Sequence, residues 1–290
     1  MDKRKHFPIH QMALSNIEAW ARSPRTILML IFIVTICYLE ASAYGQTFQS
    51  MGRPLHWDEL FFYAMSTGCN IRITSVLFLV TVSELPRQMA YQYQHLIRTS
   101  RIKWLLSQWV YCIWTVLFIQ VAIALFLGLF LIPYASPGSG WTEPALISAG
   151  IISDESRIIP AYICDNLSTL QANLIAQLPI FTFRLTMVFV ILLLSLCGNG
   201  LLGVISYVFI LMAERTILVE AFYGIVLPTN FSAMAYIAAT FTSHEWVNAG
   251  SELSSIAITL TGYAVVAFGL MLLMVIRTKY CDLSFDGSHN

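Results

Sequence analysis

Residues 84–108 read ELPRQMAYQYQHLIRTSRIKWLLSQ and form a polar, basic island between two long apolar runs. Four basic residues lie within seventeen positions of this island: Arg87, Arg98, Arg101 and Lys103. Because the apolar runs on both sides are long enough to cross a membrane, the island is predicted to connect two membrane spans. The rest of the chain is arranged around this connection.

The island itself is predicted to contain a helix over 86–99. Proline suits the first turn of a helix, as at Pro86, and no Gly or Pro follows until the next apolar run is under way. Its polar face would carry Tyr91, His95 and Arg98, and its apolar face would lie against a membrane surface. Two interpretations stay open: a loop whose positive charges fix orientation, or a docking helix for a soluble partner.

Composition places the chain among integral membrane proteins. Of its 290 residues, 57% are hydrophobic and only 11% are charged, against about 25% charged in soluble domains. The formal net charge is zero, so attraction to nucleic acid is not indicated. The six cysteines show no CxxC or Cys/His spacing, so no metal or redox site is predicted. We therefore expect an all-α membrane protein with a single transmembrane domain over 1–290.

Six apolar runs are predicted as transmembrane helices: 26–45, 60–83, 104–133, 175–197, 200–217 and 256–276. A turn at 197–200, where two glycines permit a tight reversal, separates the fourth run from the fifth. Apolar residues at helical spacing over 9–22 predict an amphipathic helix on the inner membrane surface, with a disordered basic tail as the alternative.

Two further segments are expected on the outer side. Residues 134–173 form the longest polar insertion, a small cap rather than a second domain. Residues 220–246 are apolar but broken by Gly224, Pro228 and Asn230, which favours a broken re-entrant segment.

The distribution of basic residues predicts that both termini are cytoplasmic. Eleven Lys and Arg residues fall in the predicted inner segments: Lys3, Arg4, Lys5, Arg22, Arg25, Arg87, Arg98, Arg101, Lys103, Arg277 and Lys279. Three fall in the predicted outer segments: Arg53, Arg157 and Arg215. Cytoplasmic segments carry the excess of positive charge in membrane proteins. A five-span arrangement, with the fourth and fifth runs fused, would place two of these basic residues outside and is disfavoured.

Four charged residues lie within or near the ends of the predicted spans: Glu40, Arg72, Arg184 and Glu214. Charged groups at membrane depth are costly unless they snorkel, pair or face a wet cavity. Arg184 and Glu214 lie in the outer parts of the fourth and fifth spans, where they could pair across the hairpin. Glu40 and Arg72 are candidate pathway residues, with pairing or snorkelling as the alternative.

The sequence carries no recognisable catalytic or nucleotide-binding motif. It has no GxxxxGK[ST] loop, no HExxH and no GxSxG element. Neither is a convergent set of His, Ser or acidic residues evident within the spans. We therefore predict no enzymatic activity, no catalytic residue and no cofactor for this chain itself.

The order of these segments resembles the permeases of the type 2 class of ABC exporters. The shared layout is an amphipathic N-terminal helix, two spans, a basic intracellular helix ending RTSRIKWLLSQ, a third span, a tight fourth-to-fifth turn, a broken outer segment containing Leu227-Pro228 and a sixth span. At the level of individual residues the similarity is specific around 84–108. The insertion at 134–173 is longer than that of compact members of the family.

The resemblance implies a partner and a mechanism. Residues 86–99 would be the coupling helix that sits in a groove of a separate ATPase subunit, with 9–22 as the connecting helix. The implied contacts with that subunit are Arg87, Tyr91, His95, Arg98 and Arg101. ATP and Mg would be bound by the partner, a second permease copy or a related permease would complete the pathway, and the location would be the plasma membrane of a bacterium.

An exporter of an amphipathic peptide, an antibiotic or a lipid-like substrate is therefore the expected function. Two other classes stay open: a stand-alone secondary transporter or channel, and a membrane-embedded enzyme. A secondary transporter would need ionisable residues at mid-bilayer, whereas the charges here are predicted near span ends.

Overall fold

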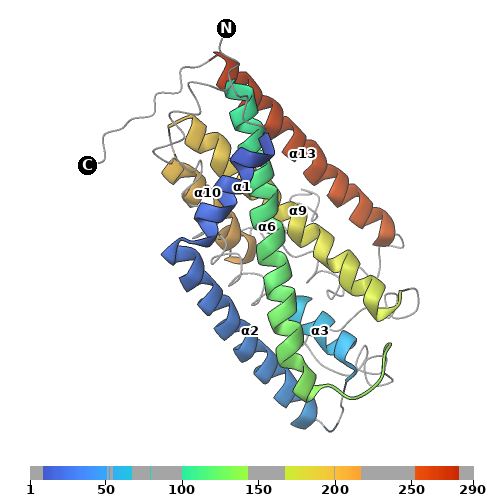
Figure 1. Cartoon of the computed structure of the whole chain (residues 1–290). Coiled ribbons are helices and arrows are strands. Elements are labelled where there is room, and N and C mark those ends of the chain that lie inside the picture. Colours follow the sequence, from blue (N-terminus) through green and yellow to red (C-terminus); the bar gives the residue numbers. More distant parts are fainter. Residues whose placement is uncertain are drawn as a thin grey trace.

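The computed structural model describes residues 9–50, 52, 55–66, 79, 100–142, 167–198, 200–216 and 252–280. Over these ranges the chain is helical and has no strand; a single isolated bridge joins His56 and Ser136. Figure 1 shows the helices running lengthwise beside one another. The predicted all-α class is confirmed for this part of the chain.

The helix α6, Arg101–Leu131, is the centre of the bundle and begins inside the basic island of 84–108. Ser100 caps it by accepting a hydrogen bond from the Lys103 backbone N–H at 3.4 Å. A short 3₁₀ turn, η1 (Ile132–Tyr134), continues it. α6 packs against α1, α2, α3, α9 and α13, so the predicted third span is the helix on which the others assemble.

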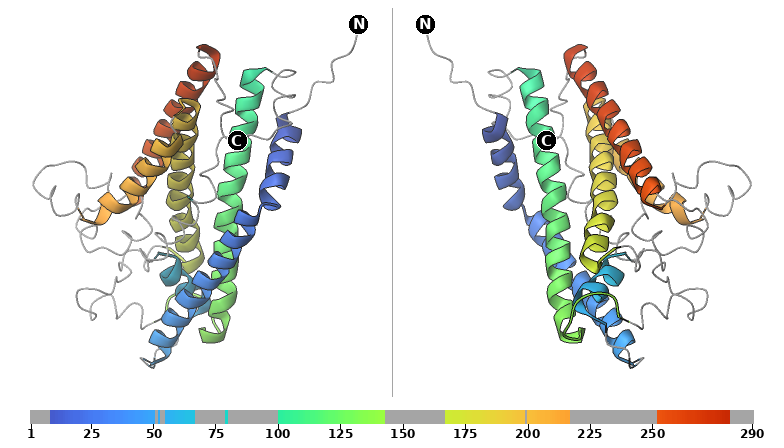
Figure 2. Two further views of the ribbon diagram at one scale, coloured as in Figure 1. Left: turned by 90° about the vertical axis from the view of Figure 1, so that its left-hand side faces the viewer. Right: turned by 90° about the vertical axis from the view of Figure 1, so that its right-hand side faces the viewer.

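The N-terminal helix α1, Ile9–Ala21, covers nearly all of the segment 9–22 that was predicted as an amphipathic helix on the membrane surface. Its buried residues recur at spacings of one to four: Met12, Ala13, Asn16 and Trp20. Trp20 meets Phe118 of α6 edge-on, with ring centroids 5.3 Å apart. Figure 2 shows α1 lying lengthwise beside the first half of α6. Because α6 covers it, the apolar face of α1 is used for packing against protein.

The next helix, α2 (Pro24–Ser50), presents one narrow stripe to the bundle. The buried positions repeat every three to four residues: Thr26, Met29, Ile33, Cys37, Ala41 and Gly45. Gly45 lets the ring of Tyr134 approach so closely that a Cβ would lie 2.1 Å from the ring carbon Cγ. The other side of α2 exposes large apolar residues, as expected for a face in contact with hydrocarbon.

α9 (Thr169–Leu196) and α10 (Gly200–Thr216) form a hairpin. Gly198, with φ of 85°, makes the reversal between them. A Cβ on Gly203 of α10 would lie 2.9 Å from the Cα of Ile191 on α9, so the two backbones are in close contact. The structure therefore has two helices where the disfavoured five-span arrangement required one.

Contacts between helices define the two ends of the bundle. Trp109 and Gln120 of α6 meet Phe189 and Arg184 of α9 in that order, so α6 and α9 are antiparallel. α13 (Glu252–Tyr280) packs along α9, and Arg277 Nε donates to the Leu196 carbonyl at 3.4 Å. The start of α6 and the ends of α9 and α13 therefore lie together (Figure 2).

We call this the cationic end, defined by four residues: Arg101, Lys103, Arg277 and Lys279. The opposite end holds α3 (Trp57–Ser66), the loop over 135–142 and the start of α9. We call it the acidic end, defined by Asp58 and Glu59 in the first turn of α3. The two ends thus differ in the sign of their charge among the described residues.

Four of the described helical segments are long and apolar enough to cross a membrane: Pro24–Ser50, Arg101–Tyr134, Thr169–Leu196 and Leu260–Lys279. This indicates a membrane protein. α10 is shorter, at 17 residues. Of the predicted second span, 60–83, the structure describes residues 60–66, which belong to α3, and Leu79. The predicted coupling helix at 86–99 and the broken segment at 220–246 lie outside the described residues.

Several boundaries differ from the predictions. α2 continues five residues beyond the predicted end at 45, and α13 extends the predicted 256–276 at both ends. α9 begins at Thr169, so the last part of the predicted insertion 134–173 is helical. A capping box formed by Ser168 and Gln171 fixes this start.

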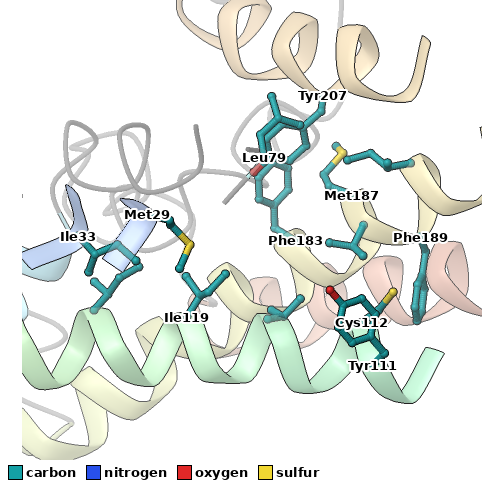
Figure 3. Close-up of a cluster of buried hydrophobic side chains, with 14 of the residues drawn as sticks. Met29, Ile33, Leu79, Tyr111, Cys112, Ile119, Phe183, Met187, Phe189 and Tyr207 are labelled. Carbon is teal, nitrogen blue, oxygen red and sulfur yellow. The ribbon is translucent and has the colours of Figure 1, made fainter. Parts of the chain in front are cut away.

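The buried core runs along α6 and includes side chains from α2, α9 and α10. Figure 3 shows Met29 and Ile33 of α2 beside Ile119 of α6, and Phe183 of α9 next to Tyr207 of α10. The aromatic pair lies close to the one arginine that the structure buries in the middle of a described helix.

Candidate functional site

Arg184 begins a chain of polar contacts between α9 and α6, which we call the arginine relay. Its Nη1 donates to Gln120 Oε1, and Gln120 Nε2 in turn donates to Gln177 Oε1. Arg184 is 2% exposed and Gln120 7% exposed. A charge buried this deeply is costly unless hydrogen bonds compensate its lost hydration, and the relay supplies an oriented acceptor.

A cluster of aromatic rings is centred on Phe183, the residue before Arg184. Phe183 stacks with Tyr207 of α10 at a centroid distance of 6.2 Å and meets Tyr263 of α13 at 6.3 Å. Figure 3 shows Phe183 and Tyr207 side by side. The relay and these rings together link four helices, so a movement of α9 would be felt by α6, α10 and α13.

The position of Arg184 corrects the sequence-based placement. We predicted the outer part of a span starting at residue 175, but α9 starts at Thr169, and Arg184 therefore lies near the middle of the helix. Its expected partner Glu214 lies on α10, with a side chain outside the described residues, so that pairing stays a prediction. The partner that the structure does describe is Gln120.

Of the other predicted site residues, the structure describes the side chains of Glu40 and Arg101, and neither belongs to this relay. Glu40 lies on α2, one turn after Cys37, and is half-buried. Arg72 lies outside the described residues. Arg101 is the first residue of α6 and is exposed at the cationic end. The remaining predicted docking residues also fall outside the described part of the chain: Arg87, Tyr91, His95 and Arg98.

A second polar site lies at the acidic end, where Asp58 joins three segments. Its Oδ2 accepts hydrogen bonds from the Gly140 backbone N–H at 3.2 Å and from Thr169 Oγ1. Its backbone carbonyl accepts from Asn173 Nδ2 at 2.8 Å. Asp58 therefore ties the first turn of α3 to the loop over 135–142 and to the start of α9. We call this site the acidic junction.

Glu59 makes a separate contact in the same junction. Its Oε2 accepts from the Thr142 backbone N–H at 3.4 Å and from Thr142 Oγ1 at 3.0 Å. The residue is fully buried, and burial raises the pKa of the Glu59 carboxyl to about 7, although the bonds from Thr142 oppose this. Glu59 precedes the predicted span 60–83.

Aromatic side chains and a second backbone contact reinforce the junction. Trp57 Nε1 donates to the Gly128 carbonyl at 2.9 Å, and Trp141 Nε1 donates to the Leu167 carbonyl at 2.8 Å. The backbone N–H of Ser136 donates to the Leu55 carbonyl at 2.9 Å. The first bond joins α3 to α6, and the other two hold the loop against Leu55 and Leu167, which precede α3 and α9.

Sequence reasoning did not select the junction residues or the glutamines of the relay. Two signals were available for the junction: paired acids in the first turn of α3 and the Ser168–Gln171 capping box. The relay gave a weaker signal, because Gln120 and Gln177 are single polar residues within apolar runs. Only the packing of α6 on α9 brings them to Arg184.

The described fold and these two sites define a helical membrane protein with a buried charged contact between spans. Comparisons with known protein families, with characterised proteins and with solved structures find no match. In the part of the chain that the structure describes, no group of three His, Cys, Asp or Glu side chains could hold a metal ion.

Proposed function

We propose that the chain is the membrane-spanning permease subunit of an ATP-driven ABC transporter, coupled to a separate ATPase subunit, and that it exports an amphipathic or lipid-like substrate. The observation that carries the proposal is the helix order around α6, with the basic island of 84–108 leading directly into the central helix. A force applied to that island would reach every helix that packs on α6.

The charges at the two ends of the bundle support an orientation with the basic island on the cytoplasmic side. The cationic end gathers basic residues from α6 and α13, while the described part of the opposite end carries Asp58 and Glu59. Positive residues favour the cytoplasmic side of a membrane. The basic island would then face the compartment that holds ATP and a soluble ATPase.

α1 supports the coupling role. It lies along the first half of α6 and is joined to α2 through a bend, where Thr26 Oγ1 donates to the Trp20 carbonyl at 2.7 Å. α1 and the start of α6 therefore form a two-helix unit beside the island. Closure of the partner would move this unit, and the permease would change conformation if the partner bound one conformation more tightly than the other.

A stand-alone secondary transporter is the second candidate, and one observation favours it. Arg184 lies near the middle of α9 rather than at a span end, and ionisable residues at that depth are typical of ion-coupled or substrate-binding sites. The two candidates differ in whether a separate ATPase is required.

The test is capture of an ATPase by the tagged chain. We would co-express the protein with candidate ABC ATPase subunits, purify it in mild detergent and measure the captured ATPase. We expect the double variant Arg87→Glu/Arg98→Glu to lose at least tenfold of the captured subunit, because reversing two contact charges replaces attraction by repulsion.

The matched control is Arg277→Glu/Lys279→Glu, which reverses two charges at the cationic end but outside the island. It should retain the ATPase at close to the wild-type level. Equal capture by the two double variants, or no capture by the wild type, would contradict the proposal and favour the stand-alone transporter.

A further inference from the structure

The acidic junction contains two carboxylates in adjacent positions with different surroundings. Asp58 is half-buried and accepts hydrogen bonds from the Gly140 N–H, Thr169 Oγ1 and the Glu59 N–H. The positive end of the α3 dipole also favours its charge. Asp58 therefore joins α3 to the loop and to the start of α9 through contacts that do not involve Glu59 Oε2.

Glu59 is fully buried, and within the described part of the chain only one of its oxygens is bonded. Both donors to Oε2 come from Thr142, whereas Oε1 is buried and has no hydrogen-bond partner among the described residues. An ionised carboxylate with one bare oxygen is poorly compensated for its lost hydration. Addition of a proton removes the charge and most of that cost.

No charge of opposite sign pairs with Glu59 among the residues that the structure describes. The residues that the loop and α9 bring to the junction are neutral: Thr142, Thr169 and Asn173. On the α3 side the titratable groups are Asp58 and His56. The charge of Asp58 raises the pKa of Glu59, and His56 Nδ1 lies 3.3 Å from Ser136 Oγ. The halves of α2 and α6–η1 toward this end carry the titratable groups Glu40, Tyr44 and Tyr134. No ion pair to Glu59 is formed within the described ranges.

We propose that Glu59 is a proton-binding site whose occupancy controls the attachment of the loop over 135–142 to α3. With the proton bound, the carboxyl stays buried against Thr142. When the proton leaves, the carboxylate gains hydration if Thr142 moves away, while Asp58 continues to hold Gly140 and the start of α9. The part of the loop at Thr142 thus detaches from α3 when Glu59 loses its proton, while the contacts of Asp58 remain. We call this contact the Thr142 latch.

The direction of the pH dependence follows from the raised pKa. A carboxyl with a higher pKa in the closed junction than in water binds its proton more tightly there, so the closed state is favoured at low pH and loses that advantage as pH rises. The pKa of Glu59 is about 7 in the closed junction, and about 4.5 applies to the open, hydrated state. The equilibrium constant for opening therefore rises about tenfold between pH 6 and pH 8.5. On the orientation in the proposed function, the pH outside the cell would set the latch.

The backbone amides of the loop provide separate reporters. The Thr142 N–H is bonded to Glu59, the Gly140 N–H to Asp58 and the Ser136 N–H to the Leu55 carbonyl. We would measure hydrogen exchange at single amides by mass spectrometry, on the full chain in lipid nanodiscs, at pH 6 and pH 8.5. Each rate would be divided by the intrinsic rate at that pH.

In the wild type, the protection of the Thr142 amide should fall about tenfold between the two pH values, while that of Gly140 and Ser136 changes less than threefold. Glu59→Gln, which keeps an acceptor but cannot ionise, should show no such fall. An unchanged Thr142 amide, a fall of the same size in Glu59→Gln, or an equal loss across all three amides would overturn the proposal. If the Gln variant fails to fold, the wild-type comparison of the three amides decides alone. Capture of an ATPase does not enter this test, so it is independent of the proposed function.

Discussion

Arg184 is the residue on which the buried polar contact depends. Its guanidinium sits near the middle of α9 and donates to Gln120 on another helix, so neither side chain can be removed without affecting the other. In a membrane an interhelical hydrogen bond contributes little to the free energy of unfolding, about 0.6 kcal/mol on average. Leaving a charged group with one acceptor fewer costs more, about 1–3 kcal/mol.

We therefore expect Gln120→Met to lower the free energy of unfolding by about 1–3 kcal/mol, because it removes the acceptor and leaves the guanidinium in place. The double variant Gln120→Met/Arg184→Met should be less destabilised than the sum of the single changes. Thr35→Val, which removes an exposed hydroxyl bonded within α2, is the control and should have little effect. Denaturant titration in detergent micelles gives the unfolding free energies of both single variants, the double variant and the control, and additive effects of the two changes would contradict the relay.

Individual contacts of this kind could be predicted only in part. Arg184 was selected from the sequence because a charge within an apolar run is conspicuous and costly. Its position along α9 differs from the predicted one because the helix begins at Thr169, within the predicted insertion, and its glutamine partners depend on which faces of α6 and α9 meet. The acids of the junction lie just before the predicted span 60–83 and were not selected, because their bonds to Thr142 and Thr169 come from segments distant in sequence.

The helices α9 and α10 show how a small residue sets the distance between two elements. Gly203 lies so near Ile191 that any added side chain must separate the helices, whereas a Cβ on Gly269 of α13 meets nothing within 4 Å. The predicted reversal at 197–200 was visible in the sequence as a pair of glycines. The close contact at Gly203 was not, because a glycine inside an apolar run gives no indication of its neighbour.

Replacement of these two glycines by alanine should change the free energy of unfolding differently. Gly203→Ala is expected to lower the free energy of unfolding by about 1–3 kcal/mol, because overpacking forces the hairpin apart. Gly269→Ala should be neutral or stabilise by up to about 1 kcal/mol, since Ala is the better helix former. Thermal unfolding of the purified protein compares the two, and equal effects would show that the α9–α10 contact is not close-packed.

The molecule as a whole is a bundle around α6 with a cationic end and an acidic end. Apolar periodicity was sufficient to predict most of its described helices, because each must either pack on α6 or face hydrocarbon. Helix ends were less predictable: the sequence does not show how far α6 and α13 project beyond a bilayer. On the proposed function, the cationic end is the side on which the ATPase docks.

That orientation can be measured with cysteine labelling in intact cells. Cys197 is exposed in the turn between α9 and α10, at the cationic end, and Ser139 is exposed in the loop at the acidic end. Two variants would each retain one cysteine, the native Cys197 or a cysteine from Ser139→Cys, with the other cysteines replaced. A membrane-impermeant maleimide should label the position at 139 in intact cells and Cys197 only after the membrane is permeabilised. Labelling of Cys197 in intact cells, with the position at 139 protected, would place the basic island outside the cell and rule out coupling to a cytoplasmic ATPase.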